Sequence, residues 1–242
     1  MEATTSDGQR IHYRRTEGDR PVLLVHGFAS NAEATWDATG WLRALEEAGR
    51  GVIAVDLRGH GASSKPTDAD SYSAEILAAD LVAVLDAESV DGVDAVGYSM
   101  GSQVARQLAV SRPDRVRRLV LGGIGPTEPF RTVGAGLLRS ALLDPDQPIE
   151  PFVEGLLAGT RELPAADRSA LAACVDGMAA SPLAGEPAAV TLVVAGELDP
   201  VARGADGLAK SLGAGYLAIP GRRHGNTLSA RAFKQAVVEF LA

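Results

Sequence analysis

The sequence predicts an α/β fold, in which helices flank a doubly wound, mostly parallel β-sheet and a helical cap is inserted. Short apolar, β-branched runs alternate with segments of helical periodicity along most of the chain, which is the order that βαβ units produce. The alternation stops once, between residues 125 and 186, where no strand-like run occurs. These two observations predict the architecture and the position of the insertion.

Six apolar runs have the length and composition of strands. They cover residues 21–25, 51–55, 91–96, 116–121, 190–195 and 215–219. The runs that are apolar throughout fit parallel strands buried on both faces. Residues 10–15 show a two-residue period instead and predict an antiparallel hairpin at one edge.

Helical periodicity fills the intervals between these runs. Leu77, Leu81, Val84 and Leu85 repeat at helical spacing, and Phe233, Val237, Phe240 and Leu241 do the same near the end of the chain. An apolar stripe at this spacing is typical of a helix that packs one face on a sheet.

The interval 125–186 predicts several helices separated by proline-containing joints. We expect residues 1–124 and 187–242 to form the α/β core and residues 125–186 to form the cap, because insertions at the strand ends roof the ligand site of open α/β sheets. Helices that merely pack on the flank of the sheet are the alternative.

Composition excludes several function classes. The 242 residues contain 23 Lys and Arg against 31 Asp and Glu, for a net charge of −8, without a basic cluster, so nucleic acid is not an expected partner. The polar first twenty residues and the lack of an apolar run near the ~20 residues of a membrane span predict a cytoplasmic protein without membrane contact. No sequence feature specifies an oligomeric state.

Cysteine and histidine usage argues against disulfides and metals. Cys174 is the single cysteine, so no internal disulfide or cysteine cage can form, and its place on an apolar helix face predicts a small buried side chain. The four histidines lack the spacing of metal ligands. We therefore expect neither a metal nor another cofactor.

The segment Gly97-Tyr98-Ser99-Met100-Gly101 follows the run 91–96 and precedes an expected helix. A serine between two glycines at such a turn is typical of a nucleophile whose hydroxyl is exposed above the sheet. Ser99 is therefore the candidate nucleophile.

A base and an acid follow in the chain. His224 is the only histidine after Ser99, on a glycine-containing loop before the last helix, and a histidine there can reach a serine hydroxyl. Asp199, in the turn after the run 190–195, is expected to orient the imidazole, with Glu197 as the alternative acid.

The tetrahedral intermediate of such a reaction needs donors for its oxyanion. Met100 N–H, next to the nucleophile at a helix N-terminus, is one candidate. Phe28 N–H, in the loop after the run 21–25, is the other, because Gly27 lets the backbone approach closely.

Taken together, these motifs resemble those of the α/β-hydrolase fold family, in its capped esterase, lactonase and carbon–carbon hydrolase branch. The matching pieces are His26-Gly27-Phe28, Asp56-Leu57-Arg58-Gly59-His60-Gly61, Gly97 to Gly101, Gly196 to Asp199, and His224-Gly225. They occur in family order over nearly the whole chain. Ser102 is a departure, since many relatives carry glycine there.

The resemblance implies a serine hydrolase acting on a small-molecule substrate through an acyl-enzyme. The expected cap holds four arginines against nine carboxylates, so it does not attract anions, and a small neutral carboxylic ester or lactone is the expected substrate. We expect four residues to contact it: Tyr98, Leu138, Leu142 and Leu156. Hydrolysis of a carbon–carbon bond in a vinylogous diketone, or a related elimination, and a non-catalytic small-molecule receptor are the alternatives.

The remaining histidines and arginines near these motifs are expected to be structural. His26 and His60 precede Ser99, so we expect them to brace their loops through hydrogen bonds to the backbone. Arg58 is expected to pair with a carboxylate, and Arg222 and Arg223 to be solvated.

Overall fold

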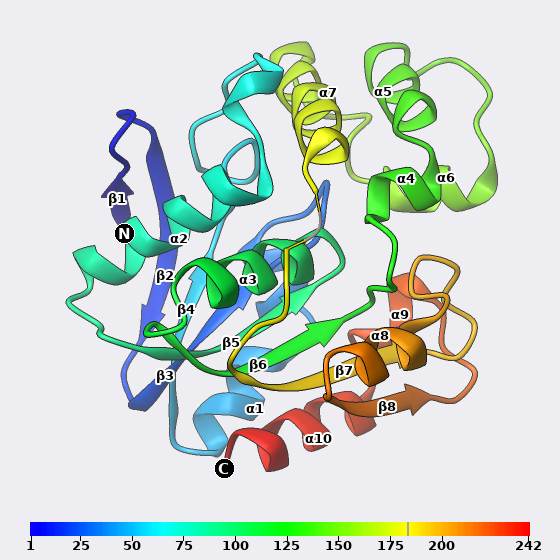
Figure 1. The fold of residues 1–242 in the computed structure, drawn as a ribbon. Helices are drawn as coiled ribbons and strands as arrows, with labels where there is room; N and C mark the ends of the chain where they lie inside the picture. The colour runs from blue at the N-terminus through cyan, green and yellow to red at the C-terminus, as the bar shows by residue number, and fades with distance from the viewer. Residues whose placement is uncertain (183) are drawn as a thin grey trace.

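The computed structural model describes residues 1–182 and 184–242; Leu183, within the expected cap, lies outside the described residues. Eight strands form one sheet in the order β1-β2-β4-β3-β5-β6-β7-β8 (Figure 1). Their bounds are β1 Glu2–Thr4, β2 Arg10–Thr16, β3 Asp19–Val25, β4 Arg50–Val55, β5 Val93–Tyr98, β6 Val116–Gly122, β7 Val190–Gly196 and β8 Gly215–Ile219. The β1–β2 and β2–β4 pairs are antiparallel and all other pairs are parallel. The expected fold class and its antiparallel edge are confirmed.

Helices cover both faces of this sheet. Those outside the interval 125–186 are α1 Trp41–Glu47, α2 Ala74–Ala87, α3 Met100–Ser111, α8 Ala205–Ser211, α9 His224–Thr227 and α10 Arg231–Leu241, with a π-helical turn at Glu33–Asp37 and a 3₁₀ turn at Ala69–Ser71. Buried residues of α2, α3 and α8 share one hydrophobic cluster, whereas those of α1 and α10 share another.

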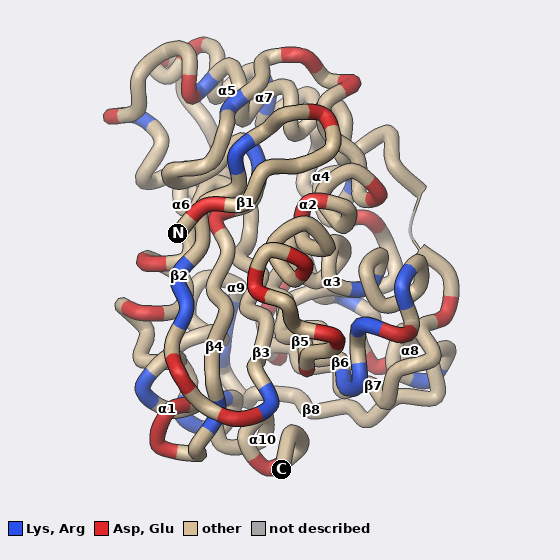
Figure 2. Tube along the Cα trace, turned by 90° about the vertical axis from the view of Figure 1, so that its left-hand side faces the viewer, with Lys and Arg blue, Asp and Glu red and all other residues tan. Residues whose placement is uncertain are grey.

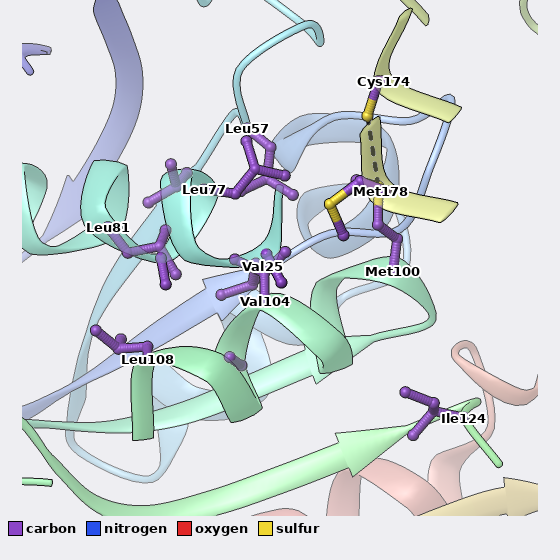
Figure 3. Packing of buried hydrophobic residues seen from close by; sticks show 14 of the residues in the cluster. Val25, Leu57, Leu77, Leu81, Met100, Val104, Leu108, Ile124, Cys174 and Met178 are labelled. Atoms are coloured by element: carbon purple, nitrogen blue, oxygen red, sulfur yellow. Dashed lines mark hydrogen bonds between the residues drawn. The ribbon is translucent and has the colours of Figure 1, made fainter. Parts of the chain in front are cut away.

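The alternation of side chains along β3 explains why there are two clusters. Leu23 and Val25 belong to the cluster under α2 and α3, and Val22 and Leu24 to the one over α1 and α10, because successive side chains of a strand point to opposite faces. Figure 3 shows part of the first cluster, which contains Val25 of β3, Leu77 and Leu81 of α2, and Val104 and Leu108 of α3. The part of β3 that is apolar at every position, Val22 to Val25, is thus buried on both faces, as the sequence predicts.

The interval between β6 and β7 holds α4 Pro129–Val133, α5 Ala135–Leu143, α6 Pro151–Leu156 and α7 Ala165–Ala180. These four helices, which we call the α4–α7 segment, stand together at the top of Figure 1, far from α1 and α10 at the bottom. No strand occurs among the described residues of this interval. Cys174 on α7 is buried, with its Sγ 3.9 Å from Sδ of Met100 at the start of α3 (Figure 3).

Acidic and basic residues are interspersed along the chain on the side drawn in Figure 2 rather than gathered by sign. In the described part of the chain, no helix is both long enough and apolar enough to span a membrane.

Close packing of α3 on β3 yields a stability prediction. A Cβ atom added at Gly101 would lie 2.1 Å from the Val25 carbonyl oxygen and 2.4 Å from that of His26, so the backbone must move to admit it. We expect Gly101→Ala to lower the free energy of unfolding by about 3 kcal/mol or more, measured by urea denaturation.

Gly207→Ala is the matched control, because Gly207 lies in α8 and its added Cβ would meet no atom within 4 Å. Alanine favours helix over glycine by up to about 1 kcal/mol, so this variant should be as stable as the parent or more so. Equal stability of the two variants would contradict the packing argument.

Candidate active site

Ser99 lies at the turn between β5 and α3 in a backbone conformation that is rare for residues other than glycine. Its φ is 55° and its ψ is −123°. The turn is tight enough that a Cβ at Gly97 would lie 2.4 Å from the Gly101 carbonyl oxygen, so Gly97 must be glycine for the same reason as Gly101. The two glycines of the sequence motif thus permit the turn that presents Ser99 at the end of the strand.

The carbonyl of Gly122, at the end of the neighbouring β6, holds this turn in place. It accepts hydrogen bonds from Ser99 N–H at 2.8 Å and from the Ser102 hydroxyl at 2.8 Å. Ser102 is fully buried, so this departure from the family pattern adds a bond that glycine could not make. The strain at Ser99 is therefore offset by hydrogen bonds from both sides of the turn.

His224 connects Ser99 with Asp199 through both ring nitrogens. Its Nε2 lies 3.0 Å from Ser99 Oγ and its Nδ1 lies 2.8 Å from Asp199 Oδ2. An ionised carboxylate only accepts hydrogen bonds, so Nδ1 carries the hydrogen and Nε2 is free to accept the serine proton. The structure brings together the three residues predicted as nucleophile, base and acid.

Asp199 rather than Glu197 faces the imidazole. The Asp199 side chain is buried, and its Oδ1 accepts from the N–H groups of Val201 at 2.9 Å and Ala202 at 3.3 Å. Glu197 is exposed, and its Oε2 accepts instead from Gly221 N–H at 3.0 Å. The residue that follows the strand by three positions thus points inward, while Glu197 braces the loop before His224.

The backbone of the loop after β3 approaches Ser99 closely. The Cβ position of Gly27 lies 3.3 Å from Ser99 Cβ and 3.9 Å from Ser99 Oγ. Neither Phe28 N–H nor Met100 N–H has an acceptor within the described ranges. Both predicted oxyanion donors are therefore unpaired beside the nucleophile, and Met100 adds the N-terminus of α3.

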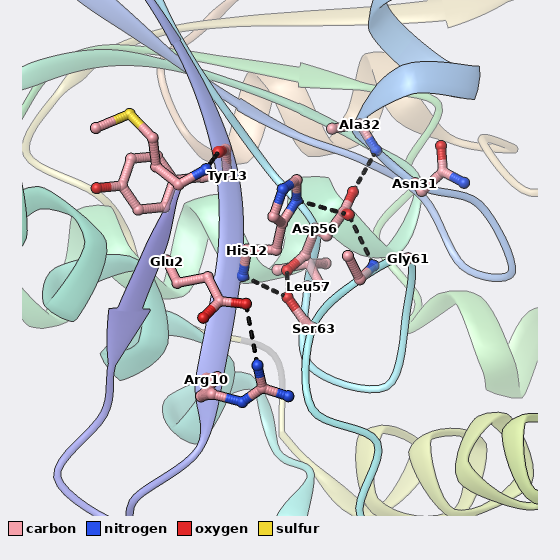
Figure 4. A network of polar contacts seen from close by, with 12 residues as sticks. Glu2, Arg10, His12, Tyr13, Asn31, Ala32, Asp56, Leu57, Gly61 and Ser63 are labelled. Atoms are coloured by element: carbon pink, nitrogen blue, oxygen red, sulfur yellow. Dashed lines mark hydrogen bonds and ion pairs between the residues drawn. The ribbon is translucent and has the colours of Figure 1, made fainter.

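Asp56 fixes two of the loops around Ser99 (Figure 4). Its carboxylate accepts from Ala32 N–H at 2.8 Å and from Ala62 N–H at 2.9 Å, and lies 3.2 Å from Nδ1 of His12. Burial works against ionisation, but these hydrogen bonds and the nearby His26 and His12 outweigh it and lower the pKa of Asp56. Asp56 thus acts as an anionic brace for the loops after β3 and β4.

His26 and His60 brace loops, as predicted. His26 Nδ1 donates to the Gly27 carbonyl at 2.7 Å and its Nε2 accepts from Leu57 N–H at 3.0 Å. His60 Nδ1 lies 3.0 Å from the Arg58 carbonyl oxygen. Burial lowers the pKa of both rings, to about 3 for His60, where the neighbouring His26 adds to the effect.

The arginines near the motifs fall into one that pairs with carboxylates and two that, in the described structure, do not. Arg58 is fully buried and pairs with Asp80, its Nη2 lying 2.7 Å from Oδ1, and with Asp7. Arg223 is exposed and Arg222 is half-buried, and neither side chain forms an ion pair within the described part of the chain.

Ser99 and His224 open into a cavity of about 700 Å³ between the sheet and the α4–α7 segment. Of the residues expected to contact a substrate, Tyr98, Leu138 and Leu156 line it. Leu142 does not: it is fully buried in the hydrophobic cluster, one turn and about 6 Å further along α5 than Leu138. The sequence pattern marks the apolar face of α5 but not where the cavity ends along it.

The cavity also contains side chains that sequence reasoning missed. Lys65, in the loop after β4, and Asp167, on α7, line it with Nζ and Oδ2 3.8 Å apart. They are the only lysine, arginine or carboxylate side chains among its described lining residues, so the opposite charges offset each other. No local pattern could pair them, because 102 positions of chain separate the two residues.

No group of three or more His, Cys, Asp or Glu side chains in residues 1–182 and 184–242 could hold a metal ion. The groups that the structure brings together at Ser99 are a hydroxyl, an imidazole, a carboxylate and unpaired backbone N–H groups.

Part of the chain is similar in sequence to known proteins. The model of a family described as "alpha/beta hydrolase fold" matches residues 20–148. The 2-hydroxymuconate semialdehyde hydrolase of Pseudomonas sp. (strain CF600) is 39% identical over 118 residues, which are 48% of this chain and 40% of that protein. The chain spans less than half the length of this curated relative and of others that it matches.

Solved structures match over the whole chain. A hydrolase from Pseudomonas aeruginosa PA01 is 29% identical with a TM-score of 0.76, covering 100% of this chain and 98% of that one. Est816, described as an N-acyl homoserine lactone degrading enzyme, is 26% identical with a TM-score of 0.75, covering 99% and 100%.

The hydroxyl of Tyr98 yields a prediction about the stability of this site. It donates to the His224 carbonyl at 2.5 Å, and both residues are buried. Because Tyr98→Phe leaves that carbonyl without its donor, we expect it to lower the free energy of unfolding by about 1–3 kcal/mol, measured in urea. Tyr216→Phe, at an exposed tyrosine of β8, should stay within about 0.5 kcal/mol of the parent; a similar loss in both variants would argue against a role for this bond.

Proposed function

The chain belongs to the α/β hydrolase fold family, and from that premise we propose that it is a serine hydrolase that cleaves a small neutral carboxylic ester or lactone. The observation that carries the proposal is the chain of two hydrogen bonds from Asp199 through His224 to Ser99, at 2.8 and 3.0 Å. This is the arrangement that acyl transfer by a serine requires.

The proposed reaction has two halves. Ser99 Oγ attacks the carbonyl carbon while His224 Nε2 takes its proton, and the N–H groups of Phe28 and Met100 stabilise the oxyanion. The intermediate then expels the alkoxide, which receives the proton from His224, and an acyl-enzyme remains. Water repeats the sequence with the same three residues and releases the acid.

The lining of the cavity supports a neutral substrate. Lys65 and Asp167 offset each other, and the α4–α7 segment contributes apolar side chains such as Phe130, Leu138 and Leu156. We propose that this segment acts as a cap that excludes water and selects the acyl or alcohol group. The lactone-degrading activity named for Est816 supports including lactones.

Three variants test the proposed roles. Ser99→Ala, His224→Ala and Asp199→Asn should each lower kcat/KM on an activated short-chain ester by about 10⁴-fold or more. A fluorophosphonate probe should label the parent and not Ser99→Ala. Ser111→Ala, at the opposite end of α3, is the control that keeps activity and labelling; full activity in the three variants would refute the mechanism.

A second candidate is hydrolysis of a carbon–carbon bond by the same residues. The 39% identity to a 2-hydroxymuconate semialdehyde hydrolase favours it. Product analysis separates the two, because ester cleavage yields an acid and an alcohol, whereas cleavage of a vinylogous diketone yields an acid and an enol or its ketone. Turnover of esters alone would exclude this second candidate.

A further inference from the structure

His60 lines the cavity, and one of its ring nitrogens has no partner in the part of the chain that the structure describes. The side chain lines the cavity at Ser99 while its residue is only 2% exposed. Its Nδ1 lies 3.0 Å from the Arg58 carbonyl oxygen, and since a carbonyl only accepts, Nδ1 carries the hydrogen. The lone pair is therefore on Nε2, which has no hydrogen-bond partner among the described residues.

The neighbouring His26 shows what a purely structural histidine does in the same place. The two rings lie edge to face with centroids 5.1 Å apart. His26 pairs both nitrogens with the backbone, through Gly27 and Leu57, whereas His60 pairs only one. Bracing of the loop thus explains both ring nitrogens of His26 but only one of the two ring nitrogens of His60.

The surroundings of His60 keep its ring neutral and its acceptor desolvated. The Phe28 ring stands edge to face with it at 5.6 Å, and Phe130 packs in the same manner on Phe28 at 4.9 Å. Burial and the neighbouring His26 lower the pKa of His60 to about 3, so Nε2 remains an acceptor at neutral pH. A buried acceptor of this kind costs free energy until a donor pairs with it.

We propose that His60 Nε2 accepts a hydrogen bond from a hydroxyl or amide N–H of the bound substrate, and so selects esters or lactones that carry such a donor. This inference rests on the proposed function. His60 and Ser99 line the same cavity, so an ester or lactone bound at Ser99 can present such a group to Nε2. An ester without that group leaves Nε2 unpaired and is discriminated against.

Matched substrate pairs test the selection. The pairs are methyl 3-hydroxybutanoate and methyl butanoate, 2-hydroxy-γ-butyrolactone and γ-butyrolactone, and 2-acetamido-γ-butyrolactone and its N-methyl derivative. We expect kcat/KM to favour the donor-bearing member of at least one pair by about tenfold or more. His60→Phe, which keeps a ring against Phe28, should reduce that ratio to less than about twofold.

Comparing the ratio of kcat/KM values within a pair removes general losses of activity, because disturbed packing lowers kcat/KM for both substrates of the pair. Phe130→Leu is the matched control: it alters the other aromatic contact of Phe28 without touching the acceptor, and should keep the parental ratio. No preference in any pair of the parent, or a preference that survives in His60→Phe, overturns the inference.

Binding to Ser99→Ala separates this inference from the proposed function. Calorimetry should show tighter binding of the donor-bearing member, and the difference should vanish in Ser99→Ala/His60→Phe. In protein labelled with ¹⁵N-histidine, that ligand should shift the Nε2 resonance of His60 toward the value of a hydrogen-bonded nitrogen. If no ester or lactone is turned over, the proposed function fails, and these two measurements still decide the role of His60; equal binding and an unmoved resonance overturn it.

Discussion

Two stretches of backbone meet at van der Waals distance at the carboxyl edge of the sheet, and the rest of the candidate site is built around that meeting. A Cβ atom added at Gly27 would lie 3.3 Å from Ser99 Cβ on one side, and Gly101 leaves no room for a side chain against Val25 on the other. Such proximity lets N–H groups of two different loops face a single point. Side-chain donors would hold that arrangement less rigidly, because they can change rotamer. The positive φ of Ser99 is the strain that this geometry entails.

Buried hydrogen bonds to the backbone hold the loops around this point. The carbonyl of Gly122 receives two of them from the turn at Ser99, Asp56 receives two from the loops after β3 and β4, and Tyr98 donates one to the residue that carries the imidazole. Each of these bonding residues lies in a strand or directly after one, so the rigid sheet fixes the positions of the loops. A loop bound in this manner has little freedom to relax when a neighbouring side chain changes.

Sequence reasoning reached the strands and helices and chose the three residues that the structure joins at 3 Å or less. It succeeded there because each strand is a local apolar pattern, and because Ser99, Asp199 and His224 lie in the turns and loops after strands whose carboxyl ends share one edge. It was wrong for Leu142, and it missed the pair of Lys65 and Asp167 and the free nitrogen of His60. Those features depend on how α5 and α7 sit over the sheet and on which lone pair a backbone carbonyl leaves unused. Periodicity and motif spacing carry no information on either.

The contact between Cys174 and Met100 has a practical consequence. The single thiol of the chain is enclosed between α7 and the start of α3, and burial raises its pKa. While α7 stays in place, a thiolate-seeking reagent therefore cannot reach Cys174, and its sulfur is not in the reactive thiolate form. Modification of this sulfur requires α7 to lift away from the helix that begins beside Ser99. The rate at which Cys174 is alkylated therefore reports how often the α4–α7 segment separates from α3 and the sheet.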